Sequence, residues 1–138
     1  MLRIACVLIT ALVFGTESAA RAADKTVSIP DIFLHMFRTR AGAARSAWFK
    51  ANAAGRAVSY KAKVYILNRE KDGANIFLEY GFGDAVVCKI PTHMLPQIQG
   101  LTKGAKARCE GTLSRYSQSL GSIFVWIDTQ KIEQPDAN

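Results

Sequence analysis

The chain has 138 residues, of which 49% are hydrophobic, and it carries a formal net charge of +7. This length fits one domain, and the basic excess favours anionic partners such as nucleic acid, lipid headgroups, acidic glycans or an acidic protein face. The 18 lysines and arginines are spread along the chain without a dense block, so a surface that only keeps the protein soluble is the alternative.

The first residues follow the order of a secretory signal peptide. Arg3 supplies a positive charge, and residues 4–14 form an apolar core of the expected length. A membrane-spanning helix needs about 20 apolar residues, and here polar residues begin at Thr16. Ala20 and Ala22 place small side chains at the two positions that signal peptidase recognises. We therefore expect cleavage after Ala22.

Export follows from this signal, to a bacterial periplasm as the first choice of compartment and to the medium as the second. Removal of residues 1–22 takes away Arg3, Arg21 and Glu17, which lowers the net charge by one, to +6. The alternative interpretation is that the apolar run forms a buried strand or helix of the mature fold.

A helix is predicted after a short lead. Ser28 is a suitable cap, and Pro30 falls in the first turn. Apolar residues recur along one helical face at Phe33, Phe37, Ala41, Ala44, Trp48 and Ala51. Gly55 is a suitable end, and Gly42 leaves a bend or break in the middle open.

From Val58 onward the hydrophobic period is two, which is typical of half-buried strands. Strands are expected at residues 58–66, 75–80, 85–90, 105–114 and 122–132. Asp72-Gly73 fits a hairpin turn between the first two strands. Residues 91–101 break the pattern and favour a short irregular helix between the third and fourth strands.

Two cysteines remain after the signal, Cys88 and Cys109. In an oxidising compartment such a pair in a small domain favours a disulfide, which on the chain-entropy model stabilises by about 3 kcal/mol. Strand alternation places both thiols on inward faces. Zinc would need more ligands, and His35 and His93 stand in unrelated contexts, so no metal or cofactor is expected.

The element order is that of an OB-fold: three strands, a helix-like insert and two more strands. In its amino-acid sequence the chain resembles the tRNA-anticodon-binding-like OB-fold family of exported bacterial proteins. The resemblance lies in residues 51–54, Tyr60–Val64, Val87–Ile90 and Leu101–Gly111, and covers most of residues 45–133. It implies a mainly β protein, a five-stranded OB-type barrel with an N-terminal α-helix packed on it.

Four segments follow from these patterns. They are a signal peptide at 1–22, a lead segment and N-terminal helix at 23–56, the OB-fold barrel at 57–133, and a flexible tail at 134–138. No GxSxG, HExxH, P-loop or dinucleotide glycine motif is present, so no enzymatic activity is expected. Asp72, Glu79 and Asp84 form an acid/base or metal set only if a turn gathers them, and a solvated turn explains them more simply.

The function that remains is a non-catalytic exported OB-fold binding or adaptor module, whose partner is an envelope protein or an anionic polymer. The alternative is a binder of single-stranded nucleic acid or another polyanion through a basic, aromatic barrel face. Peripheral membrane contact through the basic N-terminal helix is a third possibility. The candidate binding surface consists of Lys61, Lys63, Tyr65, Arg69, Phe77, Phe82, Lys89, Phe124 and Trp126.

Two members of that surface have an alternative role. Phe124 and Trp126 share one face of the last strand, opposite the apolar residues that alternate with them. They either lie beneath the N-terminal helix, covered by Phe33, Phe37 and Trp48, or form an exposed patch that contacts a partner.

Overall fold

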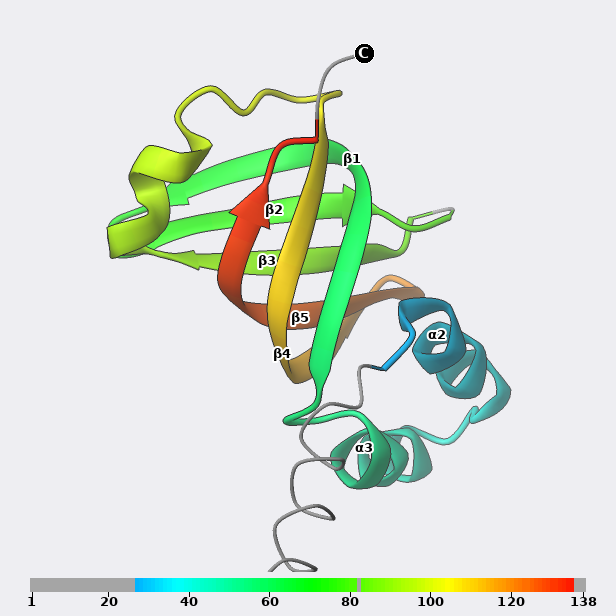
Figure 1. Ribbon diagram of the computed structural model, residues 1–138. Helices are drawn as coiled ribbons and strands as arrows, with labels where there is room; N and C mark the ends of the chain where they lie inside the picture. Colours follow the sequence, from blue (N-terminus) through cyan, green and yellow to red (C-terminus); the bar gives the residue numbers. More distant parts are fainter. Residues whose placement is uncertain (1–26, 82, 136–138) are drawn as a thin grey trace, which may run out of the picture.

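The computed structural model describes residues 27–81 and 83–135 (Figure 1). The predicted signal peptide, most of the lead, Phe82 and residues 136–138 lie outside the described residues. The helical elements are α2 (Ile29–Arg38), α3 (Gly42–Asn52) and the 3-10 helix η1 (Thr92–Ile98). The strands are β1 (Ala57–Glu70), β2 (Gly73–Glu79), β3 (Ala85–Pro91), β4 (Lys106–Ser119) and β5 (Ser122–Glu133).

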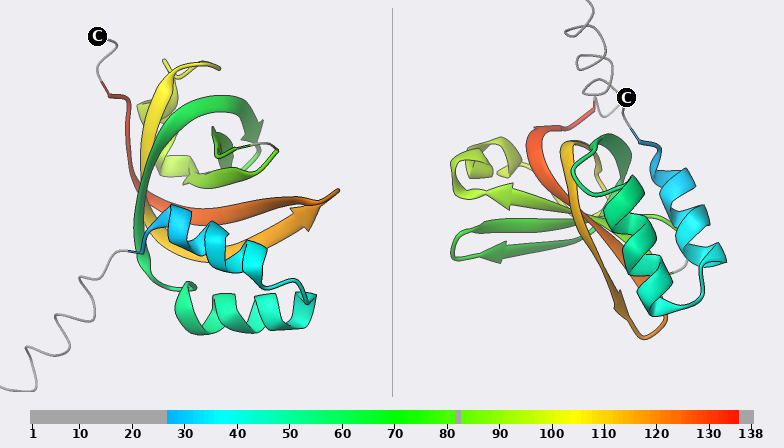
Figure 2. Two further views of the ribbon diagram at one scale, coloured as in Figure 1. Left: turned by 90° about the vertical axis from the view of Figure 1, so that its right-hand side faces the viewer. Right: turned by 90° about the horizontal axis from the view of Figure 1, so that it is seen from below.

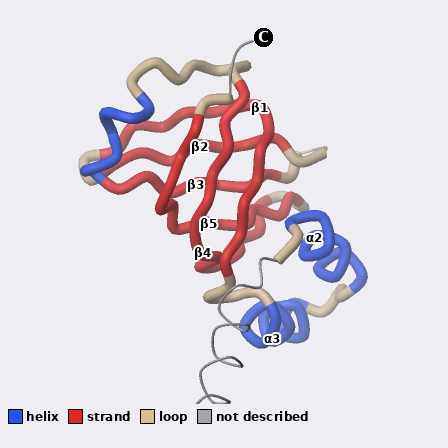
Figure 3. The backbone as a smooth tube through the Cα atoms, viewed as in Figure 1, coloured by secondary structure: helices blue, strands red, loops and turns tan. Residues whose placement is uncertain are grey.

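The strands close into a barrel in the order β1-β2-β3-β5-β4, and Figure 3 shows the two helices outside it. All pairs are antiparallel except β3 with β5. The first half of β1 pairs with β4 and its second half with β2, so this one long strand closes the barrel. The architecture confirms the predicted five-stranded OB-type barrel.

The interior follows the alternation that the sequence predicts. Along β3 and β5 the residues Val86, Cys88, Val125 and Ile127 are fully buried. Side chains between them point outward and cover a second, outer face. The 3-10 helix η1 lies against β2, β3 and β5 and inserts Met94 and other apolar side chains into one end of the core.

The predicted single helix is two helices, joined at residues 39–41. The expected face is wrong in part: Phe33 is buried, but Phe37 is 45% exposed, at the edge of the buried stripe of α2. The buried side chains are instead Ile29, Ile32, Phe33 and Met36 from α2 and Phe49 from α3. None of the helices in the described residues is long and apolar enough to span a membrane.

The two helices lie side by side at one end of the barrel, near the β4–β5 hairpin (Figure 2). Phe33 stacks on Tyr80 with ring centroids 4.0 Å apart, and Phe49 lies 5.2 Å from Tyr116. The expectation that the N-terminal helical segment contacts the barrel is therefore confirmed. Within residues 27–81 and 83–135, the rings of the helices contact the barrel at Tyr80 and Tyr116.

Strand β1 departs from simple alternation. A bulge between Val64 and Ile66 inserts an extra residue, Tyr65, relative to β2. Beyond the bulge the parity changes, so Ile66, which alternation predicts inside, is 38% exposed. The same change places Arg69 opposite buried Ala74 and on the other side of β1 from Glu70, and both side chains are exposed near the end of the strand.

Candidate ligand-binding face of the barrel

One line of outward residues crosses the whole sheet. Ile66 of β1 stands opposite Phe77 of β2, Phe77 opposite Val87 of β3, and Val87 opposite Trp126 of β5. Trp126 in turn stands opposite Arg115 of β4. The outer face therefore has a defined row of apolar and aromatic side chains from β1 to β5, with a cation at its end.

Four rings on this face form what we call the aromatic cluster: Tyr65, Phe77, Phe124 and Trp126. Phe77 is central, with ring centroids 5.9 Å from Tyr65, 6.1 Å from Phe124 and 6.5 Å from Trp126. All three contacts are edge-to-face, the geometry that the ring quadrupoles prefer. Val87 lies between Phe77 and Trp126 and is fully buried although it points outward. The cluster is a small apolar layer on the outside of the barrel.

The alternative that Phe124 and Trp126 lie beneath the N-terminal helices is not what the structure has. Both are half-buried against Phe77, whereas Phe33 packs on Tyr80 and Trp48 stacks on His35 at 4.8 Å. Burial raises the pKa of the Tyr65 phenol above its ordinary value, which agrees with its packing in the cluster.

A groove of about 440 Å³ adjoins the cluster at Trp126 and is lined by side chains from all five strands. Trp126 forms its apolar wall, and the guanidinium carbon of Arg115 lies 3.9 Å from the centroid of the indole. The indole nitrogen donates a 2.9 Å hydrogen bond to Ser117 Oγ, which fixes the ring. The polar side chains that line the groove include Glu70, Asn75, Lys89, Arg115 and Asp128.

The basic residues of β1 face those of β4. In the strand register Lys61 stands opposite Arg108, and Lys63 stands opposite Lys106. Within the described residues the ion pairs join Glu133 to Arg108 at 3.7 Å and to Lys131 at 2.8 Å. No carboxylate there pairs with Lys61, Lys63 or Lys106. We call these four residues the basic pairs. Outward positions along β1 lead from Lys61 through Lys63 to Tyr65 in the aromatic cluster.

A second cleft, of about 470 Å³, lies between Tyr65, Glu79 and the turn that contains Asp84. Asp84 accepts a 2.7 Å hydrogen bond from the backbone N–H of Ile123, which gives this carboxylate a structural role. Asp72 is in the β1–β2 hairpin, away from this turn. No three His, Cys, Asp or Glu side chains gather as a metal site within residues 27–81 and 83–135.

The structure brings together part of the candidate binding surface that the sequence predicts. Tyr65, Phe77, Phe124 and Trp126 join in the cluster, and Lys89 lines the groove. Lys61 and Lys63 lie farther along β1, Arg69 points away, and Phe82 lies outside the described residues.

Sequence reasoning did not name Lys106, Arg108, Arg115 or Asp128 as site residues. Alternation with buried Ala107 and Cys109 marks the first two as outward, but their position opposite the β1 lysines follows from strand register. Arg115 follows a bulge after Leu113, which no simple alternation predicts.

The two cysteines lie inside the barrel, on strands that each pair with β5 and not with each other. Cys109 Sγ is 3.1 Å from Thr129 Oγ1. Burial raises the pKa of the Cys88 thiol well above its ordinary value, and a hydrogen bond with Cys109 adds to the shift. The structure has both as free thiols, and the disulfide stays a prediction.

No protein-family model and no curated protein match the chain. Solved structures do. The chain is similar to aspartyl-tRNA synthetase from Entamoeba histolytica, with 13% identity, a TM-score of 0.50, and coverage of 78% of this chain and 20% of the synthetase. It is also similar to asparaginyl-tRNA synthetase from the same organism, with 18% identity, a TM-score of 0.49 and coverage of 62% and 22%.

A third similar structure is the hypothetical protein ygiW from E. coli, with 16% identity, a TM-score of 0.40 and coverage of 62% of this chain and 81% of that one. The chain has an OB-fold. It spans about a fifth of the synthetase chains it matches. At these identities the likeness concerns the fold alone.

Proposed function

We propose that this protein is an exported, non-catalytic OB-fold module that binds an anionic polymer across the outer face of its barrel. The resemblance to exported proteins of the tRNA-anticodon-binding-like type and the signal-like residues 1–22 support export, with the periplasm as the compartment. The OB-fold supports a binding role, since its strand 2–3 face binds oligonucleotides and oligosaccharides in many proteins.

The basic pairs are the strongest support for this function. Like charges directly opposite on neighbouring strands destabilise a sheet, by roughly 0.2–1 kcal/mol for each pair. Lys61 faces Arg108, whose charge is partly offset by Glu133 at 3.7 Å, and Lys63 faces Lys106, so the second pair carries that cost in full. An anionic chain that lies along β1 and β4 would neutralise both pairs and so remove the repulsion between their like charges.

The aromatic cluster extends the same track. Tyr65 follows Lys63 on the outward side of β1 and contacts Phe77, from which the cluster continues to Trp126. A polymer held electrostatically at the basic pairs therefore meets an apolar surface next, as in proteins that combine a basic groove with aromatic contacts.

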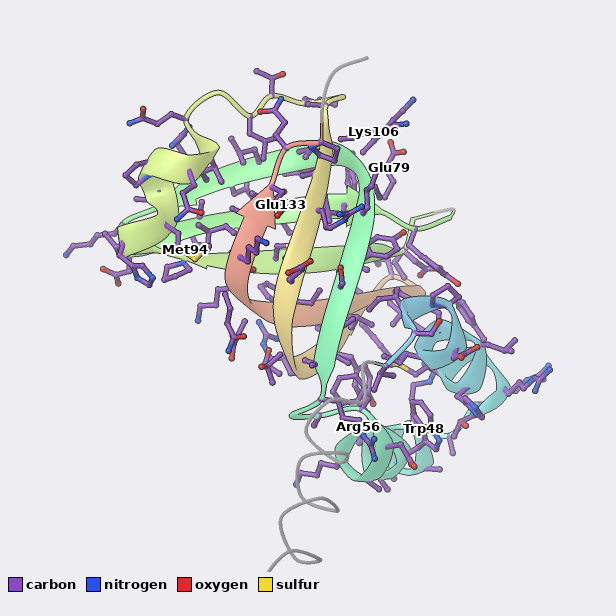
Figure 4. The ribbon with its side chains drawn as sticks, viewed as in Figure 1. Trp48, Arg56, Glu79, Met94, Lys106 and Glu133 are labelled. Atoms are coloured by element: carbon purple, nitrogen blue, oxygen red, sulfur yellow. The ribbon has the colours of Figure 1, made fainter. Side chains whose placement is uncertain are left out.

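The test compares two double variants. Lys63→Gln/Lys106→Gln removes one lysine from β1 and its partner on β4. Arg38→Gln/Lys50→Gln removes the same charge from exposed positions on the helices, at the far end of the molecule from Lys106 (Figure 4). Binding to oligo(dT), polygalacturonate and heparin is measured by fluorescence anisotropy at several salt concentrations.

We expect the native protein to bind polyanions with salt-dependent affinity. For oligo(dT), loss of two contacts lowers the slope of log K against log salt by about 1.4 in the strand-pair variant. The helix variant should behave like the native protein. If no polyanion binds even at low salt, the proposal is wrong. An adaptor role then takes its place if crosslinking in the envelope fraction captures one dominant protein.

A further inference from the structure

The groove beside Trp126 holds charges of both signs that do not pair. Lys89 and Arg115 supply cations, and Glu70 and Asp128 supply carboxylates. The ion pairs in the described residues involve Glu133 and not these four side chains, so each cation of the groove stays more than 4.0 Å from its carboxylates. Opposite charges that share a cleft without contact leave room between them for a ligand that interacts with both.

Arg115 is positioned to bind a carboxylate. Its guanidinium lies on the face of Trp126, whose ring is fixed by the hydrogen bond to Ser117. A guanidinium held on an aromatic ring keeps its N–H donors at the edge, where they match the two oxygens of a carboxylate. Lys89 lines the same groove and adds a second positive charge.

The two carboxylates of the groove need hydrogen-bond donors from a ligand. Glu70 accepts a 2.8 Å hydrogen bond from the amide of Asn75, which orients it at the end of β1. Asp128 stands next to Lys89 in the register of β5 and β3. Ionised carboxylates only accept hydrogen bonds, so the groups that suit them in a ligand are hydroxyls or amides.

We infer that this groove binds a unit of an acidic glycan, a sugar polymer that carries carboxylates. Arg115 and Lys89 bind the sugar carboxylate, and Asp128 and Glu70 accept hydrogen bonds from its hydroxyls. The inference rests on the proposed function and names the class of polymer. Oligo(dT) fits the groove less well, because its phosphodiesters would face the two carboxylates and its internal sugars have no free hydroxyl to donate to them in return.

The experiment uses polygalacturonate fragments as the acidic glycan, oligo(dT) as the nucleic acid and dextran as a neutral glycan. Arg115→Gln and Asp128→Ala change exposed residues of the groove, and Lys50→Gln on α3 is the matched control. Circular dichroism checks that each variant is folded. If Arg115→Gln loosens Trp126, Lys89→Gln tests the same carboxylate contact without touching the ring.

Each groove variant should weaken polygalacturonate binding about tenfold, since each removes a charge-assisted hydrogen bond. Dextran should not compete. Asp128→Ala should leave oligo(dT) affinity unchanged or raise it, because the lost carboxylate only repels phosphate. This opposite response of the two polymers to one substitution is the signature of hydroxyl recognition.

Two results overturn the inference and leave the proposed function in place. One is native-like polygalacturonate binding by the groove variants while Lys63→Gln/Lys106→Gln loses it. The other is a rise in affinity for every polyanion in Asp128→Ala, which makes that carboxylate merely repulsive. Absence of binding to any polyanion by the native protein overturns both proposals.

Discussion

The guanidinium of Arg115 and the indole of Trp126 are stacked across neighbouring strands, with 3.9 Å between the guanidinium carbon and the ring centroid. Arg115 reaches this position because a bulge after Leu113 turns it outward, directly opposite Trp126. The indole also packs edge-on against Phe77 and donates its N–H to Ser117. These contacts join β2, β4 and β5 on the outside of the barrel, where the aromatic cluster meets the groove.

Trp126→Ala should separate a structural role from a binding role. The ring is half-buried, so its loss should lower the free energy of unfolding by about 2 kcal/mol and leave the barrel folded. Polyanion binding should fall at least tenfold. Trp48→Ala is the control, because Trp48 is also half-buried and stacks on His35 at the helical end. If both substitutions weaken binding equally, the loss comes from stability and not from a site.

Lys106→Glu should stabilise the protein while it weakens binding. The substitution turns the like-charge pair with Lys63 into an opposite-charge pair, which should raise the free energy of unfolding by about 0.5 kcal/mol at low salt. Urea denaturation at low and high salt measures this, and the gain should shrink as salt screens it. A stability that stays unchanged at low salt would mean that the facing lysines do not repel each other.

Gly111→Ala should be strongly destabilising although it adds one methyl group. A Cβ at this position would overlap the backbone carbonyl oxygen of Asp128 at the β4–β5 bulge. We expect a loss of about 2–3 kcal/mol in thermal or chemical denaturation. Gly42→Ala, in open space at the first turn of α3, should instead stabilise by about 0.4–1 kcal/mol. Equal effects of the two substitutions would contradict the close approach of β4 and β5.

The predicted disulfide has a direct test. Protein purified from the periplasm should be lighter by its two thiol hydrogens in mass spectrometry, and a peptide that joins Cys88 to Cys109 should appear after digestion without reductant. Closing this loop should add about 3 kcal/mol to the free energy of unfolding relative to the reduced protein. Alkylation of both thiols in unfolded, unreduced protein would exclude the bridge.

The reduced protein should lose stability at alkaline pH. Burial raises the pKa of the folded Cys88 thiol, so the unfolded chain releases this proton first, at the ordinary pKa of 9.0. The stability is therefore complete below pH 9 and falls above it by about 1.4 kcal/mol per pH unit, until the folded pKa is reached. Cys88→Ala should show a flatter profile in denaturation experiments from pH 7 to 10. An identical slope in this variant would assign the effect to other groups.

The barrel could be predicted from sequence because its signals are local. Alternation identified the inward residues of β3 and β5, and Asp72-Gly73 marked the first hairpin turn. The helical segment was predicted in place but not its division into two helices, since the break at residues 39–41 depends on how α2 and α3 pack on the barrel. Propensity alone marked only Gly42 as a weak point.

The site was predictable only in part, because it depends on register. Phe77, Phe124 and Trp126 were identified as outward residues, and the structure brings them together. The pairing of Lys63 with Lys106 and the position of Arg115 require knowledge of which residues stand opposite each other. The bulge at Tyr65 reverses the parity of the rest of β1, so simple alternation could not place Arg69 relative to the aromatic residues.

The two tryptophans allow one direct measurement of whether the outer barrel face binds an anionic polymer. The indole N–H signals of Trp126 and Trp48 are followed by ¹H–¹⁵N NMR during titration with polygalacturonate, and with oligo(dT) in parallel. We expect the Trp126 signal to shift progressively until saturation while the Trp48 signal, from the helical end, stays in place. A shift of Trp48 alone, or no shift of Trp126 at saturating polymer, would contradict it.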